Sequence, residues 1–277
     1  MQYQAKDKER GKTSIELGYR ALVRALLVLL LVSAVTGCGG RSGDAASPLS
    51  SEDVSGAKKT AATCRTGITR PLGSSERSYA AVVQERATAY QEPAGAPLTR
   101  FGSENVNGVP VVFEVRAQRL ASDCRPAWFH VLLPLKPNGT TGWVRAGDVE
   151  LAAVTTRLVV DLSDRTVTLY EHGRRVLRTR AAIGKPATPT PTGRYYVNQR
   201  LVPADPSGPF GPGAIGISAF SEVLTGWTQG GPIAIHGTDR PDLIGEAVST
   251  GCVRVRNDVL RTLFARTRAG TPVTVRQ

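Results

Sequence analysis

Short runs of alternating hydrophobic and polar residues dominate the chain from about residue 79 onward. YAAVVQE, VPVVFEVRAQRL and WFHVLLPL are separated by Pro, Gly and Asn, the pattern of β-strands joined by turns. A second series starts at Thr156, where RLVVDLSDRTVTLYEHGRRVLRTRAAIG alternates through three strands. Its SDR and HG segments supply turn residues, and His172 is therefore predicted to be a hairpin residue. The chain is predicted to be mainly β.

One segment after Cys252 has a helical period instead. NDVLRTLFARTRAG predicts a short helix, with Asn257 or Asp258 as its N-cap and Gly270 as its stop. The residues of its predicted buried face are Val259, Leu260, Leu263 and Phe264.

The N-terminus has the pattern of an export signal. A basic region precedes the uncharged run ALLVLLLVSAVTG, which as a helix is about 20 Å long and too short for a hydrocarbon core of about 30 Å. The run ends in VTGC, which resembles a bacterial lipobox. We expect a lipoprotein signal peptide at 1–37, with lipid on Cys38 anchoring the chain to the outer face of the membrane. A plain signal peptide or a single transmembrane anchor are the alternatives.

The composition after Cys38 predicts a linker followed by two folded parts. Residues 38–75 are predicted to be a flexible linker, because they are rich in Ser, Gly and Ala. Residues 76–152 are predicted to form a small β-module, and residues 156–277 a second domain. The module's last segment, GTTGWVRAGDVEL, resembles bacterial SH3-like β-barrel domains. Any small β-barrel that acts as a spacer is the alternative.

The chain is strongly basic. Its net charge is +12, and removal of a leader with six basic and three acidic side chains leaves +9. This balance favours binding to nucleic acid, anionic lipid or acidic cell-wall polymers. Since the chain is expected to be exported, we expect no nucleic-acid partner.

Export also changes the interpretation of the cysteines. If Cys38 carries lipid, three cysteines remain and one must be unpaired. A disulfide between Cys64 and Cys124 would stabilise the fold by roughly 4 kcal/mol in the chain-entropy model. Cys252 would then be a free thiol, a liability in an oxidising compartment unless the protein uses it.

His236 could activate such a thiol. A neighbouring imidazole takes the thiol proton and can return it to a leaving amine. His236 ends the strand-like run PIAIHG, and Cys252 follows STG, a turn in which Gly251 lets backbone amides converge as an oxyanion hole. Arg254, two positions after Cys252, would lie on the same side of a strand and could bind a carboxylate.

Two other interpretations fit a single Cys–His pair. One is a buried structural thiol with a hydrogen-bonded histidine. The other is a zinc site completed by Asp239 or Asp242, although the ligand spacing of common zinc sites is missing. The Gly-rich GPFGPGAIGISAF lacks both phosphate-loop patterns. We therefore expect neither a metal nor a cofactor.

The segment HGTDRPDLIGEAVSTGCVRVRND resembles the signature of YkuD-type L,D-transpeptidases, HGT…IG…[ST]-H-G-C-[IV]-R-x-x-N. The matching positions are His236, Gly237, Thr238, Ile244, Gly245, Ser249, Gly251, Cys252, Val253, Arg254 and Asn257. The resemblance covers roughly residues 156–277. It implies a YkuD-like β-sandwich catalytic domain with short helices.

The resemblance also implies roles for these positions. Cys252 would be the acylated nucleophile, His236 its base, and the carbonyl of Gly237 would orient the imidazole. The predicted substrate-binding residues are Arg254, Asn257, Ser249 and Thr250. The family attacks a peptidoglycan stem tetrapeptide between diaminopimelate and D-Ala, releases D-Ala and forms a 3→3 cross-link. Its members are typically acylated by carbapenems at the same Cys.

One position departs from the family pattern. Thr250 stands where the family usually has His, and a hydroxyl cannot hold a positive charge. Two alternatives to transpeptidation follow: an L,D-carboxypeptidase that uses water as the acceptor, and a cell-wall-binding lipoprotein whose catalytic site has decayed.

Overall fold

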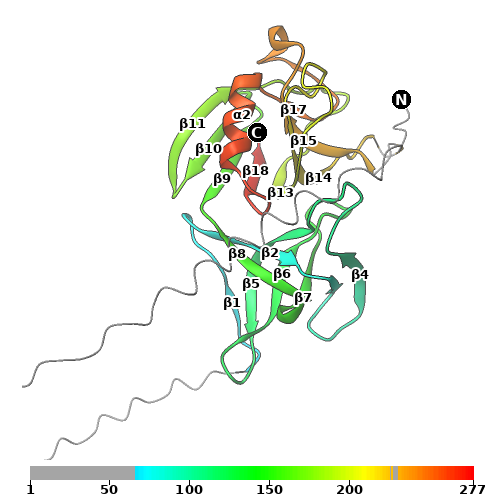
Figure 1. Ribbon diagram of the computed structural model, residues 1–277, viewed down its shortest axis with the longest axis vertical. Coiled ribbons are helices and arrows are strands. Elements are labelled where there is room, and N and C mark those ends of the chain that lie inside the picture. The colour runs from blue at the N-terminus through cyan, green and yellow to red at the C-terminus, as the bar shows by residue number, and fades with distance from the viewer. Residues whose placement is uncertain (1–65, 225, 227–229) are drawn as a thin grey trace, which may run out of the picture. The chain divides into compact units, whose positions relative to one another are not determined.

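The computed structural model describes residues 66–224, 226 and 230–277, nearly half of which lie in the strands of two eight-stranded β-sheets (Figure 1). The predicted signal peptide, Cys38 and Cys64 lie outside the described residues. All of the described residues belong to one compact unit. The prediction of a mainly β protein is confirmed.

The first sheet is built from the N-terminal strands. Its strands are β1 (Thr69–Pro71), β2 (Ser78–Val83), β3 (Arg86–Tyr90), β4 (Pro97–Gly102), β5 (Val112–Leu120), β6 (Pro126–Leu132), β7 (Thr141–Arg145) and β8 (Val149–Val154). They follow the order β4-β3-β7-β6-β5-β2-β8, and β1 pairs with β5. Alternate positions of these strands bury a core that contains Phe113, Val131 and Val144. The likeness of this sheet to an SH3-like module stays a prediction.

Two features of this sheet bear on the linker and disulfide predictions. Residues 69–71 were expected in the flexible linker, but they form β1 and pair with residues 117–119 of β5. The linker prediction is therefore wrong for this segment, because a long-range strand pairing orders it. Cys124 is disulfide-bonded. Its pairing with Cys64 stays a prediction, because Cys64 lies outside the described residues.

The second sheet carries the residues of the predicted catalytic domain. Its strands are β9 (Thr156–Asp161), β10 (Thr166–Glu171), β11 (Arg174–Arg180), β13 (Gly193–Leu201), β14 (Ala214–Phe220), β15 (Pro232–His236), β17 (Val253–Arg254) and β18 (Pro272–Arg276). Their order is β11-β10-β9-β18-β13-β14-β15-β17, and β12 (Ile183–Gly184) pairs with β16 (Ala247–Ser249) in a separate two-stranded sheet. His172 and Gly173 both have positive φ in the turn between β10 and β11, which confirms the predicted hairpin.

Helix α2 (Asn257–Arg266) follows β17 and packs on the second sheet's core. Leu260 and Leu263 are fully buried, and Val259 and Phe264 pack beside them, so the predicted buried face is confirmed. The predicted first and last residues of this helix were wrong.

The helix begins at Asn257 rather than being capped by it, and its N-cap position is Arg256, which makes no side-chain capping bond. It ends at Arg266, before Gly270, where the Thr267 amide and hydroxyl both donate to the carbonyl of Leu263. The tertiary contact of Asn257 described below displaces the expected cap.

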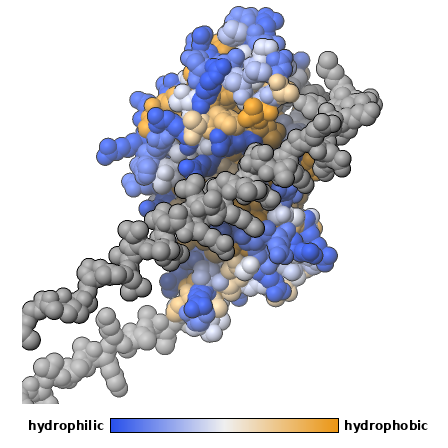
Figure 2. Space-filling model, viewed as in Figure 1, coloured by the Kyte–Doolittle hydropathy of each residue, from blue (hydrophilic) through white to orange (hydrophobic). Residues whose placement is uncertain are grey.

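The visible surface is mostly hydrophilic, with hydrophobic residues scattered between polar ones (Figure 2). Within residues 66–224, 226 and 230–277, no helix has both the length and the hydropathy needed to cross a membrane.

Candidate active site

Parallel pairing of β15 and β17 brings the two ends of the sequence motif together. Ile235 is the register partner of Val253, and His236 is the partner of Arg254. The amide of Val255 donates a 2.9 Å hydrogen bond to the carbonyl of His236. Cys252 directly precedes β17, so this register places it beside the end of β15. The loop from Gly237 to Gly251 thus leaves the edge of the sheet and returns to it.

Cys252 is a free, partly exposed thiol at this edge. Burial raises its pKa, although the backbone amide of Ala234, which donates to the sulfur, and the positive charge of Arg254 both act to lower it. Ala234 and His236 are two positions apart on β15 and therefore face the same side of the strand. The thiol therefore lies beside β15 at Ala234, two positions before His236.

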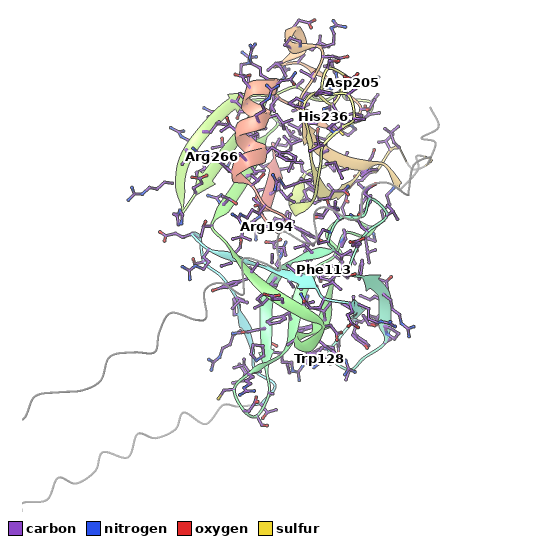
Figure 3. The ribbon with its side chains drawn as sticks, viewed as in Figure 1. Phe113, Trp128, Arg194, Asp205, His236 and Arg266 are labelled. Atoms are coloured by element: carbon purple, nitrogen blue, oxygen red, sulfur yellow. The ribbon has the colours of Figure 1, made fainter. Side chains whose placement is uncertain are left out.

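His236 is only 3% exposed and lies at the end of β15 in the second sheet (Figure 3). Burial lowers its pKa to about 4; the hydrogen bond to Gly237 and the charge of Asp239 oppose this shift, and Arg254 adds to it. The ring is therefore neutral at pH 7.

The tautomer of His236 follows from its hydrogen bond. Nδ1 lies 2.6 Å from the carbonyl oxygen of Gly237, which can only accept, so Nδ1 carries the proton. This leaves Nε2 with its lone pair free to take a proton. The ring of Phe210 packs against the imidazole with 5.0 Å between ring centres.

Asn257 holds the backbone that follows His236. Its Oδ1 accepts a 2.8 Å hydrogen bond from the amide of Thr238. A Cβ on Gly237 would collide with this same oxygen and would meet Pro212 Cδ at 2.9 Å. Only glycine therefore fits at position 237, and the structure uses Asn257 to fix the turn. Contact of Asn257 with substrate stays a prediction.

A network of hydroxyl groups fixes the turn that presents Cys252. The Ser249 hydroxyl donates to the carbonyl of Cys252 over 2.5 Å and accepts from the amide of Gly251 over 3.1 Å. Gly251 has φ +118°, as the predicted turn requires. Ser249 is buried, so its observed partners lie within the turn, and its contact with substrate stays a prediction.

Two threonines that the sequence analysis did not single out brace the same turn. Thr188 Oγ1 donates to the carbonyl of Ser249 over 3.1 Å, and Thr190 Oγ1 donates to the carbonyl of Gly251 over 2.9 Å. Both hydroxyls are buried. The signal available in the sequence was the regular ATPTPTG spacing, in which every second residue is Thr between prolines.

Arg254 is the cation of the site. It lies on the edge strand β17, and its Nε is buried without a hydrogen-bond partner. Within the described part of the chain, no carboxylate forms an ion pair with it. Its guanidinium is therefore available for an anionic group. Thr250 is exposed at the turn before Cys252.

This arrangement can perform nucleophilic acyl transfer. It combines a thiol, a neutral imidazole with a fixed tautomer, and an unpaired guanidinium. Across residues 66–224, 226 and 230–277, no three His, Cys, Asp or Glu side chains group in a way that could hold a metal ion. The zinc alternative therefore gains no support from the described residues.

Comparisons with known proteins agree with the motif. Residues 155–275 match the family model for the YkuD L,D-transpeptidase catalytic domain. A Bacillus licheniformis protein that carries the L,D-transpeptidase name YkuD is 33% identical over 165 residues, which cover 57% of this chain and 92% of that protein. Its Bacillus subtilis namesake is 36% identical over 118 residues, which cover 43% of this chain and 64% of that protein.

A solved structure is similar to part of the chain. The NMR structure of the catalytic domain from the Enterococcus faecium L,D-transpeptidase shares 28% sequence identity and has a TM-score of 0.33. The match covers 44% of this chain and 96% of that domain. The sequence relatives carry the family assignment.

Proposed function

Because the chain belongs to the YkuD family of L,D-transpeptidase catalytic domains, we propose that it forms 3→3 peptidoglycan cross-links through a Cys252 acyl-enzyme. The observation that supports this proposal is the parallel pairing of β15 with β17, which brings Cys252 beside β15, two positions before His236. The donor would be a stem tetrapeptide, as the resemblance of the motif implies.

In the acylation step, the Cys252 sulfur attacks the carbonyl carbon at the L-centre of diaminopimelate. Since the pKa of the thiol is raised and that of His236 is about 4, both groups start neutral. The thiol proton therefore passes to Nε2 of His236 as the C–S bond forms. Backbone amides of the turn are suited to stabilise the oxyanion. The C–N bond then breaks, and the departing D-Ala amine takes the proton from His236.

In the second step, an acceptor amine attacks the thioester. His236 Nε2 takes a proton from this amine, the new C–N bond forms, and the C–S bond breaks. The proton returns to the sulfur, which restores the thiol. Throughout, the bond from Nδ1 to Gly237 supports the positive charge that develops on the imidazole, without a carboxylate partner.

The charges near the site favour an anionic donor. The guanidinium of Arg254, which has no ion-pair partner in the described residues, would bind a carboxylate of the stem peptide. The exposed Thr250, together with Ser249 and Asn257, is proposed to shape this subsite. The leader and Cys38 would place the enzyme on the outer face of the membrane, where a basic protein meets the anionic wall.

The assay for this proposal uses a purified disaccharide-tetrapeptide and mass spectrometry. We expect release of D-Ala together with 3→3 dimers, and neither product with Cys252→Ala. D-Ala release without dimers would replace the transpeptidase proposal by an L,D-carboxypeptidase. Binding to sacculi with neither product would support a decayed wall-binding lipoprotein.

A further inference from the structure

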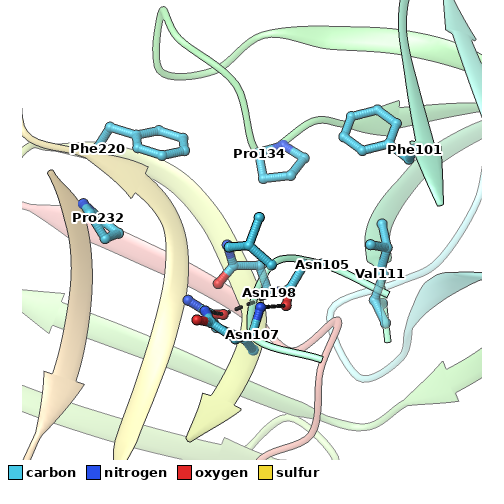
Figure 4. A pocket seen from close by; sticks show the side chains of 11 residues that line it. Phe101, Asn105, Asn107, Val111, Pro134, Asn198, Phe220 and Pro232 are labelled. Carbon is cyan, nitrogen blue, oxygen red and sulfur yellow. Dashed lines mark hydrogen bonds between the residues drawn. The ribbon is translucent and has the colours of Figure 1, made fainter. Parts of the chain in front are cut away.

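A cavity of about 220 Å³ lies beside strands β13, β14 and β15, at the opposite end of β15 from His236 (Figure 4). Rings form its walls: Phe101 and Pro134 come from the N-terminal sheet region, and Phe220 and Pro232 from β14 and β15. None of the described residues that line it is charged, although the net charge of the chain is +12. The cavity therefore favours a small neutral ligand with apolar faces.

An irregularity in β13 forms the polar end of this cavity. The register of β13 against β14 shifts between Val197 and Gln199, so Asn198 is an extra residue in a β-bulge. Its Oδ1 is buried and has no hydrogen-bond partner. Opposite the bulge, a Cβ on Gly216 would meet Gln199 Cγ at 2.6 Å and Asn198 Oδ1 at 3.1 Å. The glycine makes room for both amides, and the unpaired oxygen calls for a donor.

The neighbouring side-chain amides leave a donor group of Gln199 close to Asn198 Oδ1. Asn105 and Asn107 both donate to Gln199 Oε1, over 3.1 and 2.7 Å. With its oxygen so engaged, Gln199 keeps its NH₂ group as a donor. Both side chains line the cavity: Asn198 carries one unsatisfied acceptor, Oδ1, enclosed in the cavity wall, and Gln199 carries a donor group, Nε2. A secondary amide carries the complementary N–H and C=O.

We propose that this cavity binds an N-acetylated amino sugar of the glycan strand that bears the stem peptide. A rotation of the Asn198 side chain would bring its enclosed Oδ1 to the cavity, where the acetamido group would donate to it and accept from Gln199 Nε2. The C–H faces of the sugar would pack on the Phe and Pro rings. The inference deepens the proposed function and rests on it. A stem peptide fits less well, because it brings charged groups to a lining without counter-charges.

The position of the cavity relative to the candidate active site supports this assignment. Pro232 lines the cavity, and Pro232, Ala234 and His236 face the same side of β15. Pro232 and His236 are four positions apart on β15, a separation of about 13 Å. Three residues of an extended peptide span about 10 Å. The Cys252 sulfur accepts from the amide of Ala234 and so lies nearer to the cavity than His236 does. A sugar in the cavity would therefore leave its stem peptide long enough to approach the thiol.

The test is calorimetric titration of the full-length chain with two tetrasaccharides. One is the β-1,4-linked tetramer of N-acetylglucosamine, and the other is the β-1,4-linked glucose tetramer, which lacks acetamido groups. We expect saturable binding of the first and at least about tenfold weaker binding of the second, because the amide pair then stays unsatisfied. Asn198→Leu should weaken binding of the first sugar about tenfold.

A second variant and a matched control guard against misfolding. Asn107→Ala changes an exposed side chain and removes one bond that orients Gln199, so binding should again weaken. Gln91→Leu removes an exposed amide elsewhere and should leave binding unchanged. Equal affinity for the two sugars, or unchanged binding in both pocket variants, would overturn the proposal. Displacement of the sugar by a free stem tetrapeptide would overturn it too.

A parallel readout separates this inference from the proposed function. Acylation of Cys252 by a carbapenem is followed by intact mass on the same preparations. Acylation without sugar binding refutes the sugar site alone. Selective sugar binding without acylation supports the sugar site while the transpeptidase proposal fails.

Discussion

The Nδ1–H of His236 donates a 2.6 Å hydrogen bond to the carbonyl oxygen of Gly237, the next residue in the chain. A backbone carbonyl here does what a carboxylate does in many catalytic triads: it fixes the tautomer and orients the ring. Unlike a carboxylate, it adds no full negative charge, and the buried imidazole consequently keeps a pKa of about 4. The following predictions use this neutral Cys–His pair.

Removal of the base should slow acylation without removing the nucleophile. For His236→Gln we expect the rate of carbapenem acylation to fall roughly 10²–10⁴-fold, the usual contribution of a general base. Stopped-flow fluorescence or time-resolved intact mass measures the rate. A melting curve close to that of the parent shows that the fold survives. An acylation rate within threefold of the parent would rule out His236 as the base.

The pH dependence of acylation should follow the imidazole on the acid side. The base is active only when neutral, so the rate should be level near neutral pH and fall as the pH drops through about 4. Alkylation of Cys252 by iodoacetamide needs the thiolate, whose pKa is raised by burial. That rate should keep rising with pH beyond 8. A plateau in alkylation below pH 7 would indicate a preformed thiolate–imidazolium pair instead.

His236 should also make stability depend on pH. Its pKa is about 4 in the folded state and near 6.5 in an unfolded chain, so the unfolded state binds a proton first as the pH falls. The contribution of neutral His236 to the free energy of unfolding is fully present above pH 6.5. It is lost between pH 6.5 and 4, which lowers the free energy of unfolding by about 3 kcal/mol. Urea unfolding at pH 7.5 and 4.5 measures it.

The matched variant for that measurement is His236→Gln, which does not titrate. The parent should lose more unfolding free energy than the variant between the two pH values, since all other titrating groups are shared. An equal loss in both proteins would contradict the depressed pKa of His236.

The threonine that braces the nucleophile turn should affect rate as well as stability. Thr190→Val removes the bond that its hydroxyl donates to the carbonyl of Gly251 and the bond that it accepts from the amide of Gly184. Each buried group left unpaired costs about 1–3 kcal/mol in unfolding free energy. We expect slower carbapenem acylation, with the plateau of the pH–rate profile at the same pH as in the parent. Thr262→Val, whose hydroxyl bonds only within helix α2, is the control. Equal effects of the two substitutions would exclude a positioning role for Thr190.

Arg254 should act on substrate binding. Arg254→Gln removes the cation proposed to bind the donor's carboxylate, so KM for a tetrapeptide donor should rise about 10–100-fold. Arg254→Lys should recover part of this loss, because it keeps the charge without the bidentate geometry. Initial rates of D-Ala release give KM and kcat separately. A fall in kcat at unchanged KM would place Arg254 in transition-state stabilisation rather than donor binding.

Local sequence patterns predicted a good part of the architecture. The alternation of hydrophobic and polar residues predicted the strands from Thr156 onward, and the HG pair predicted the β10–β11 hairpin. Both features depend on neighbouring residues. The apolar stripe of α2 was found for the same reason. Strand β1 was missed because only its pairing with β5, some 50 residues away, orders such a short polar segment.

Some residues of the candidate site could likewise be predicted from local sequence, and others could not. The sequence motif pointed to Cys252, His236 and Gly237, and β15 and β17 bring them to one edge. Asn257 had the residue type of a helix cap, yet its oxygen bonds to Thr238, 19 positions earlier. Thr188 and Thr190 act on carbonyls 61 positions away, which no local pattern predicts. Such long-range hydrogen bonds become visible only in three dimensions.

The most direct test of the central claim is the intact mass of the full-length chain after incubation with a carbapenem, with Cys252→Ala in parallel. We expect a gain of one drug mass that is absent in the variant. No gain in a folded protein whose Cys252 is reduced would contradict it, as would a gain that persists in Cys252→Ala.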